Sequence, residues 1–352
     1  MPNNDLSRRS MLKTALAGVA GLSSATLLAG CGQDRRDAVT RNTTVPGTKN
    51  LSLQLAWLAN VQSAGEIAAD KLGYFKEVGL TVATRPGGPN ANPIPLVAGG
   101  NSLVGITYAP ALMLARSQDI PVRCFGAAMQ KAPLAYFSLK SSGITSVSQY
   151  KGKKIGVQVG GEPLLSALLR KNGLDLSDVE LVKVGADTTP LITGQVDLFA
   201  AWVLNLQQLA PAKEKGLNHQ TLWDNGVRIQ SNYYIATEET LTNRRDELVA
   251  FLEAVSKGWA YAIDNPQQAV DMVAETAPGL QKKHELEEIK TLLPGFLYGP
   301  QTQQHGWGWM DKALWESALS EYQQLGVLKK PVSVDEIATW EVLNGATGRV
   351  RR

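Results

Sequence analysis

The chain has 352 residues, of which 44% are hydrophobic and 19% charged, and its formal net charge is +3 at pH 7. This length allows two lobes with separate hydrophobic cores. The small net charge, without a basic cluster interleaved with aromatic residues, argues against a nucleic-acid partner. The three histidines lie far apart and there are two cysteines, so we expect no metal site.

Residues 1–30 have the organisation of an export signal. A basic start that contains Arg8 and Arg9 precedes an apolar run that is too short and too rich in Gly and Ser to span a membrane. The arginine pair is similar to a twin-arginine signal, and Leu28-Ala29-Gly30-Cys31 is similar to a lipobox, whose cysteine is lipidated. We therefore expect lipidation at Cys31, a periplasmic or extracytoplasmic location anchored to the membrane by lipid, and a tether over 31–50. A signal with a chance cysteine is the alternative.

A β-α-β-α-β series follows the tether. Alternating apolar residues predict strands over 51–57, 80–85 and 104–107, with helices between them. In open α/β sheets ligands lie beyond the carboxyl ends of the strands, so residues after these strands are candidate ligand contacts. They are Trp57, Asn60, Gln62, Gly87, Gly88, Pro89, Asn90, Thr107 and Tyr108. The alternatives are a core tryptophan at 57 and an ordinary strand–helix turn over 86–90.

A second series of the same kind begins at Lys154. Gly160, Gly161 and Glu162 precede a predicted helix, where exposed N–H groups favour anions and the carboxylate could accept hydrogen bonds from an aminopyrimidine. A charge that complements the helix end is the alternative for Glu162. Trp202 and Asn205 follow the last strand of this series.

Two crossings of the chain between the lobes are expected, near 138 and near 235. They divide the chain into a first lobe over 51–137 and 236–352 and a second over 138–235, and such crossings serve as hinges. Tyr233 lies at the return crossing and is a further candidate contact. The region after Arg244 has helical periodicity, and Cys124, in an apolar strand, is expected to be buried.

Five short segments resemble a known family. They are Leu53-Gln54-Leu55-Ala56-Trp57, Ala64-Gly65, Gly73-Tyr74-Phe75, Gly79-Leu80 and Pro86-Gly87-Gly88-Pro89. They resemble the thiamine-pyrimidine-precursor branch of the substrate-binding proteins of ABC importers, a family that also holds receptors for aliphatic sulfonates, taurine and nitrate. The resemblance implies an α/β, type II periplasmic-binding-protein fold of two lobes joined by two hinge crossings. It also implies a monomer without cofactor that binds a small-molecule ligand and an ABC permease.

The same family contains pyrimidine phosphate synthases, which have a lysine and a histidine after the strand of the third motif and a cysteine-rich run later. Here 105–111 holds neither residue and 226–237 holds no cysteine, so we expect no catalytic residues and no enzyme. Relatives in the pyrimidine branch have a glutamate near the position of Asn205, where this chain has amides.

The aromatic candidates favour a flat heteroaromatic ligand, such as a thiamine pyrimidine precursor. An aliphatic sulfonate, taurine or nitrate receptor of the same fold is the first alternative, and an exported enzyme is the second.

Overall fold

A computed structural model describes residues 49–88, 91–158 and 160–352. The expected export signal, Cys31, most of the tether, Pro89 and Asn90 lie outside these residues. Among the described residues, no helix combines the length and hydrophobicity that a membrane crossing requires.

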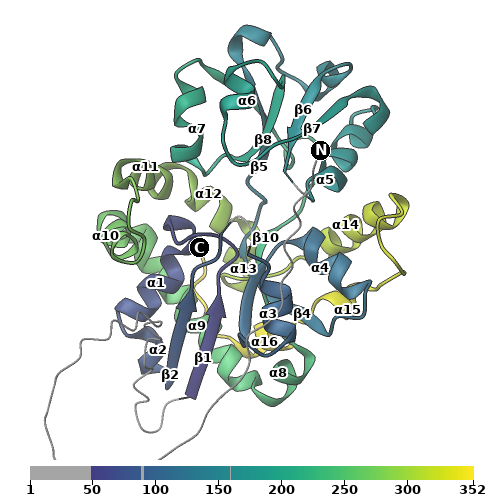
Figure 1. Ribbon diagram of the computed structural model, residues 1–352. Coiled ribbons are helices and arrows are strands. Elements are labelled where there is room, and N and C mark those ends of the chain that lie inside the picture. The colour runs from purple at the N-terminus through teal and green to yellow at the C-terminus, as the bar shows by residue number, and fades with distance from the viewer. Residues whose placement is uncertain (1–48, 89–90, 159) are drawn as a thin grey trace, which may run out of the picture. The chain divides into compact units, whose positions relative to one another are not determined.

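The strands form two five-stranded sheets (Figure 1). The first has the order β2-β1-β3-β10-β4 and the second β7-β6-β8-β5-β9. In each sheet three parallel strands are followed by an antiparallel fourth, β10 in the first and β5 in the second. The strands of the first sheet are β1 Lys49–Gln54, β2 Leu80–Arg85, β3 Val104–Thr107, β4 Val122–Met129 and β10 Ser231–Thr237. Those of the second are β5 Leu134–Leu139, β6 Lys154–Val157, β7 Glu180–Lys183, β8 Leu198–Trp202 and β9 Leu217–Thr221.

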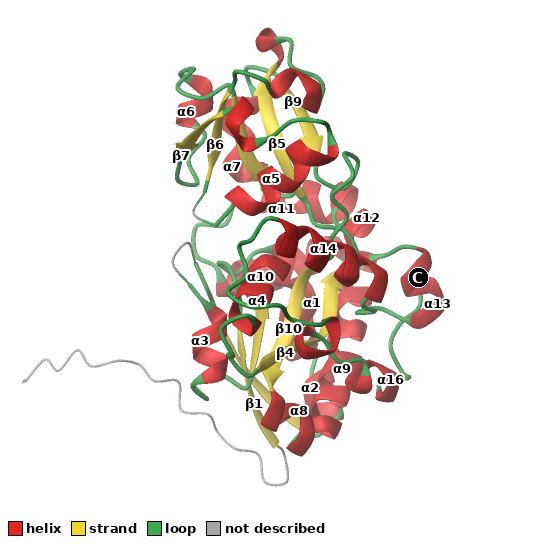
Figure 2. Ribbon diagram, turned by 90° about the vertical axis from the view of Figure 1, so that its right-hand side faces the viewer, coloured by secondary structure: helices red, strands yellow, loops and turns green. Residues whose placement is uncertain are grey.

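Helices cover both sheets, as Figure 2 shows. Those connected with the first sheet are η1 Val61–Ser63, α1 Ala64–Lys71, α2 Tyr74–Glu77, α3 Pro93–Ala98 and α4 Ala109–Arg116. Those connected with the second are η2 Lys140–Ser142, η3 Val147–Tyr150, α5 Glu162–Lys171, η4 Leu176–Asp178, α6 Thr189–Ile192 and α7 Leu206–Lys213. The C-terminal part contains α8 Glu238–Asn243, α9 Arg245–Asp264, α10 Pro266–Thr276, α11 Lys282–Glu287, η5 Glu288–Leu292, α12 Pro294–Leu297, α13 Pro300–His305, α14 Lys312–Gln324, α15 Val334–Ile337 and α16 Glu341–Gly345.

The core of the first sheet depends on a close approach of α1 to α9. A Cβ atom on Gly258 would lie 2.0 Å from the Gly65 carbonyl oxygen, and one on Gly65 would lie 2.3 Å from the ring of the buried Trp259. Glycine at both positions therefore lets the two helices touch. Cys124 on β4 is a free, buried thiol in this core, as predicted, and burial raises its pKa.

Both faces of the second sheet are buried. Tyr136 of β5 packs into one hydrophobic cluster, while its neighbours Ala135 and Phe137 pack into another. A sheet covered on both faces needs nearly continuous apolar strands, which explains the run from Leu134 to Leu139.

Both crossings lie earlier in the chain than predicted. The chain leaves the first sheet after Met129 and enters the second at Leu134, and it returns between Thr221 and Ser231. Hence β5 belongs wholly to the second lobe and β10 wholly to the first. We call residues 49–129 and 231–352 the first lobe and 134–221 the second lobe. The apolar pattern of β5 and β10 indicates strands, but it does not show which sheet each strand joins.

Hydrogen bonds pair the two crossings with each other. The Ala132 N–H donates to the Ile229 carbonyl at 2.8 Å, and Gln230 Nε2 donates to Gln130 Oε1 at 3.0 Å. Gln130 Nε2 also donates to the Trp309 carbonyl at 3.1 Å. The crossings thus form one hydrogen-bonded pair of segments tied to the first lobe. Two α/β lobes joined by two crossings confirm the predicted fold class.

Candidate functional site

The segment after β1 is tied to the segment after β2. The Gly87 N–H donates to the Trp57 carbonyl at 2.9 Å, and Gln54 Nε2 donates to the Pro86 carbonyl at 3.1 Å. A Cβ atom on Gly87 would lie 2.4 Å from the Leu55 carbonyl oxygen, so only glycine fits there. These contacts bring together the predicted Trp57 and Gly87, with Gly88 next in the chain.

The loop that follows Trp57 is fixed by a helix distant in the sequence. Asn60 Oδ1 accepts from the Gln62 N–H at 2.9 Å, the usual cap of a helical turn. The Val61 N–H donates to Glu285 Oε2, on α11, at 2.9 Å. The Gln62 side chain is buried, with 8% of its surface exposed. The loop therefore presents Gln62 in one defined position.

Gln62 connects the two lobes. Its Nε2 donates to Asn205 Oδ1 of the second lobe at 2.9 Å, and Asn205 Nδ2 donates in turn to Gln208 Oε1 at 3.0 Å. Both members of the first hydrogen bond were predicted as ligand contacts. The structure thus brings two predicted residues together that are 143 positions apart in the chain.

An aromatic pair connects the lobes at a second point. Tyr108, which follows β3, meets Trp202, which ends β8, edge to face, with ring centroids 5.5 Å apart and an interplanar angle of 74°. Thr107 precedes Tyr108 and is buried in β3. Burial raises the pKa of Tyr108 to about 12, so this phenol stays neutral. We call Gln62, Tyr108, Trp202 and Asn205 the lobe junction.

Four predicted residues, Gly160, Gly161, Glu162 and Tyr233, have no described contact with the lobe junction or with the loop that carries Trp57 and Gln62. Gly160 and Glu162 are exposed, Gly161 lies between them, and among the described residues no hydrogen bond or ion pair ties these three to the first lobe. Tyr233 is buried, with its ring centroid 4.6 Å from that of Trp315 in the core of the first lobe. Alternation predicts that at least one of Tyr233 and Tyr234 points outward, but both are buried because both faces of β10 are covered, so we leave Tyr233 out of the candidate site.

Two buried carboxyl groups near Gln62 were not predicted from the sequence. Glu285 and Glu288 are 5% and 2% exposed. Burial raises the pKa of Glu288 well above its usual range; the neighbouring Glu285 raises it further, and the Gln62 side chain opposes the rise as a hydrogen-bond partner. Burial also raises the pKa of Glu285, against the hydrogen bond from Val61. Glu285, Glu288 and the buried Ile289 lie at helical spacing on one face, but this spacing alone does not show that the two acids are buried.

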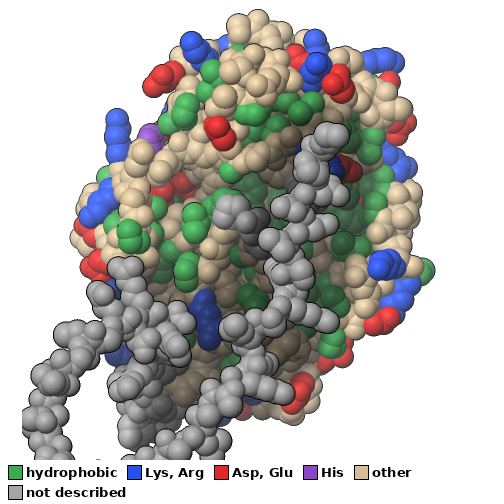
Figure 3. All heavy atoms as spheres, in the orientation of Figure 1, with side chains coloured by type: hydrophobic (Ala, Val, Ile, Leu, Met, Phe, Trp, Pro, Cys, Tyr) green, Lys and Arg blue, Asp and Glu red, His purple; other side chains and the backbone are tan. Residues whose placement is uncertain are grey.

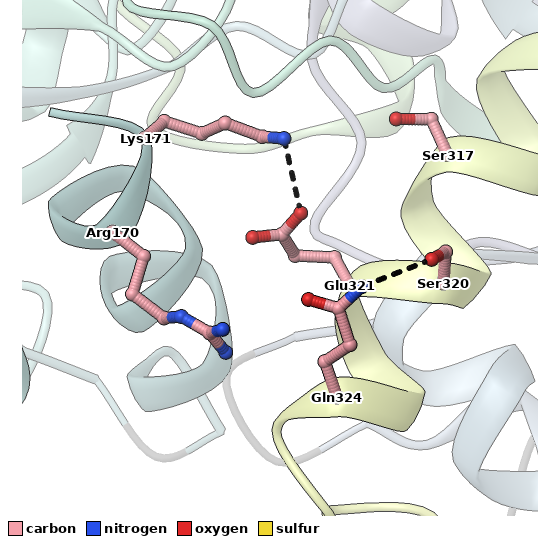
Figure 4. A pocket seen from close by; sticks show the side chains of 6 residues that line it. All are labelled: Arg170, Lys171, Ser317, Ser320, Glu321 and Gln324. Atoms are coloured by element: carbon pink, nitrogen blue, oxygen red, sulfur yellow. Dashed lines mark hydrogen bonds and ion pairs between the residues drawn. The ribbon is translucent and has the colours of Figure 1, made fainter.

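A cavity of about 320 Å³ lies elsewhere, between α5 and α14 (Figure 4). It is lined by Arg170, Lys171, Ser317, Ser320, Glu321 and Gln324. Lys171 of α5 and Glu321 of α14 form an ion pair of 3.3 Å across it. None of the predicted site residues lines this cavity. Its cations are exposed, and we regard it as a surface contact between the lobes.

Charged side chains of both signs are interspersed on the visible part of the face shown in Figure 3. Within the described residues, no group of three or more side chains is placed to hold a metal ion.

The family described as NMT1/THI5 like matches residues 60–269. The riboflavin-binding protein RibY of Chloroflexus aurantiacus is 25% identical over 314 residues, which cover 86% of this chain and 88% of that protein. The formylaminopyrimidine-binding protein of Halalkalibacterium halodurans is 26% identical over 302 residues, 82% of this chain and 89% of that protein. A more partial match is a 4-amino-5-hydroxymethyl-2-methylpyrimidine phosphate synthase of Legionella pneumophila, 25% identical over 66% of this chain and 75% of the synthase.

Among solved structures, the periplasmic aliphatic sulphonate binding protein SsuA from Escherichia coli is similar, with a TM-score of 0.65 and 17% identity over 82% of this chain and 91% of SsuA. This similarity confirms the periplasmic-binding-protein fold that the sequence predicted.

Proposed function

The chain belongs to the NMT1/THI5-like family, and from this premise we propose that it is the extracytoplasmic solute receptor of an ABC importer. Its two lobes close on a small heteroaromatic molecule, such as a thiamine pyrimidine precursor. The relatives named as binding proteins for riboflavin and formylaminopyrimidine support this class of ligand. Lipidation of Cys31 anchors the receptor beside its permease, and the closed form is the one that the permease engages.

The lobe junction is the observation that carries the proposal. Its four side chains come from the ends of strands or from the segments that follow them in both sheets, the region where α/β proteins bind ligands. Tyr108 and Trp202 offer aromatic surfaces to a flat ring, a contact that contributes about 0.5–1.5 kcal/mol beyond burial. Gln62 and Asn205 offer amide donors and acceptors. A ligand seated among them contacts both lobes only in the closed form and so shifts the population toward closure.

The acidic groups near the junction favour a heteroaromatic over an anion. The carboxyl groups of Glu285 and Glu288 beside the Gln62 loop are buried, and burial raises the pKa of each, which favours the neutral forms. A sulfonate or nitrate placed there would lose its hydration beside acidic groups, where receptors for such anions need positive charge or free N–H donors.

Binding measurements on the purified protein test the proposal. We expect calorimetry to detect binding of 4-amino-5-hydroxymethyl-2-methylpyrimidine or riboflavin, but not of taurine or nitrate. Trp202→Ala should weaken the binding about 30-fold, because truncation of a central aromatic contact costs about 2 kcal/mol. Trp309→Ala is the matched control: this ring is also partly buried but stacks on His305, with centroids 4.1 Å apart.

Binding of taurine or nitrate alone would replace the proposal by the anion receptor. Chemical conversion of a bound compound would replace it by an enzyme related to the synthases.

A further inference from the structure

We propose that Glu288 selects the ligand by pairing with an amino group and the adjacent ring nitrogen of a heteroaromatic ring. This inference rests on the proposed function and names the ligand's recognition edge.

The first observation is an unsatisfied oxygen. Glu288 is 2% exposed, and its Oε1 has no hydrogen-bond partner among the described residues. Buried polar atoms are nearly always paired, because an unpaired one is costly. A bound molecule that brings a donor or acceptor to Oε1 would remove this cost.

The second observation is the position of this carboxyl group. The Val61 N–H, next to Gln62 of the lobe junction, donates to Glu285 Oε2 at 2.9 Å, and Glu288 lies three residues further along the same helical segment. The neighbouring Glu287 forms an ion pair of 3.3 Å with Lys213 of α7, in the second lobe. The Gln281 N–H, just before α11, donates to Gln207 Oε1 of α7 at 3.4 Å. Glu288 therefore lies on the one C-terminal segment that these contacts join to the second lobe, beside the junction.

The backbone at this point is also unusual. Glu288 begins η5, a π-helical turn, immediately after the α-helical Lys282–Glu287. Such turns are frequent at functional sites, because the change in helical pitch redirects side chains.

The chemistry of the carboxyl group defines what it recognises. A neutral carboxylic acid donates one hydrogen bond through its O–H and accepts another at its carbonyl oxygen. An aminopyrimidine offers the complementary pair, a ring nitrogen that accepts and an amino group that donates. Sulfonate and nitrate oxygens only accept, so they cannot complete the pair. Burial, which keeps the pKa of Glu288 high, favours the neutral form.

Glu66 provides a matched control inside the same lobe. It is also a buried carboxyl with one oxygen unpaired, but its other oxygen accepts from the Tyr234 hydroxyl within the core of the first lobe. If replacing any buried acid were enough to weaken binding, substitutions at Glu66 and at Glu288 would both weaken it.

Calorimetry with two probes tests the inference. The probes are 4-amino-5-hydroxymethyl-2-methylpyrimidine and the same molecule without its amino group. We expect the wild-type protein to prefer the amino compound about 30-fold, the value of a hydrogen bond to a group of this kind. Glu288→Leu should abolish the preference, and it should also weaken binding of the amino-free probe, which still offers its ring nitrogen to the Glu288 O–H. If Glu288→Leu does not fold, Glu288→Met replaces it in the same test.

Two further variants sharpen the test. Glu288→Gln keeps one donor and one acceptor in place and should retain most of the preference, and Glu66→Gln should retain all of it. Equal wild-type affinity for the two probes, or an unchanged preference in Glu288→Leu, would overturn this inference and leave the proposed function intact. A glutamine variant that behaves like the leucine variant would also overturn it. Failure of the wild-type protein to bind any heteroaromatic probe would instead overturn the proposed function.

Discussion

The segments after β1 and after β6 occupy the same position in two sheets of the same strand order, yet they differ in how firmly they are held. Both strands lead to a glutamine whose amide ties neighbouring segments: Gln54 Nε2 donates to the Pro86 carbonyl at 3.1 Å, and Gln158 Nε2 to the Ala200 carbonyl at 2.9 Å. Beyond Gln54 the loop is exposed at Leu58 but is held at both ends, by the contact with Gly87 and by the hydrogen bond to Glu285. Beyond Gln158 the chain runs through the exposed Gly160.

The difference shows that equivalent positions in two similar lobes need not share a role. In the first lobe the loop after the first strand reaches the lobe junction. In the second lobe the junction is supplied by residues after β8, Trp202 and Asn205. We infer that the loop after β6 contributes little to ligand binding.

The largest expected effect is that of a methyl group added at Gly87. In Gly87→Ala the new Cβ atom would meet backbone atoms of residues 55–57 at 2.4–2.8 Å, so the loop must move. We expect a loss of about 3 kcal/mol in the free energy of unfolding, the upper range of overpacking effects. Urea denaturation measures it. Gly160→Ala, where φ is +82° and the added atom has open space, should cost only about 1 kcal/mol. Equal losses would contradict the difference between the two loops.

A pH-dependent effect should follow from Glu66, on the helix that carries the firm loop. Burial raises its pKa to about 7 from 4.5, against the hydrogen bond from Tyr234. The folded state therefore holds a proton that the unfolded state releases, so stability falls as the pH rises from about 4.5 to 7 and then levels off.

In Glu66→Gln the part of this fall that Glu66 causes should disappear, while the contributions of Glu285 and Glu288, whose pKa values burial also raises, remain. The variant should match the wild-type protein near pH 4.5 and exceed its free energy of unfolding at pH 8 by at most about 3 kcal/mol. Denaturation curves across this pH range measure the difference. Parallel curves for the two proteins would show that Glu66 does not titrate in this way.

A smaller effect is expected for the hydrogen bond between Gln62 and Asn205. A double-mutant cycle with Gln62→Ala and Asn205→Ala should give a coupling of about 1 kcal/mol in the free energy of unfolding. The control is Glu162→Gln in the loop after β6, which should change stability and ligand binding by less than about 0.5 kcal/mol. Additive effects in the cycle, or a strong loss of binding in the control, would reverse the roles assigned to the two loops.

Local pattern was enough to predict most strands but not their partners. The predicted strands at 80–85 and 104–107 coincide with β2 and β3. The strand β9, whose sequence is Leu-Asn-His-Gln-Thr, was missed because it is a polar edge strand without regular alternation. The helix α7 was also missed.

The candidate site also contains residues that the sequence predicts and one that it does not. Gln62, Tyr108, Trp202 and Asn205 could be named from the sequence, because each follows the end of a strand or a short turn after it. Glu288 could not, because its role depends on tertiary packing that brings it beside Gln62 from a distant helical region. A charged residue in a helical pattern is usually solvent-exposed, and the burial that makes this one notable is not visible in the chain.

The enclosure of Cys124 in the core of the first lobe has a practical consequence. A thiol with no exposed surface and a raised pKa does not react with maleimide dyes while the protein is folded. Fluorophores can therefore be attached to cysteines introduced at the surface of each lobe, with Cys124 left in place. Single-molecule energy transfer between such dyes would follow opening and closing directly in a protein whose interior is unaltered.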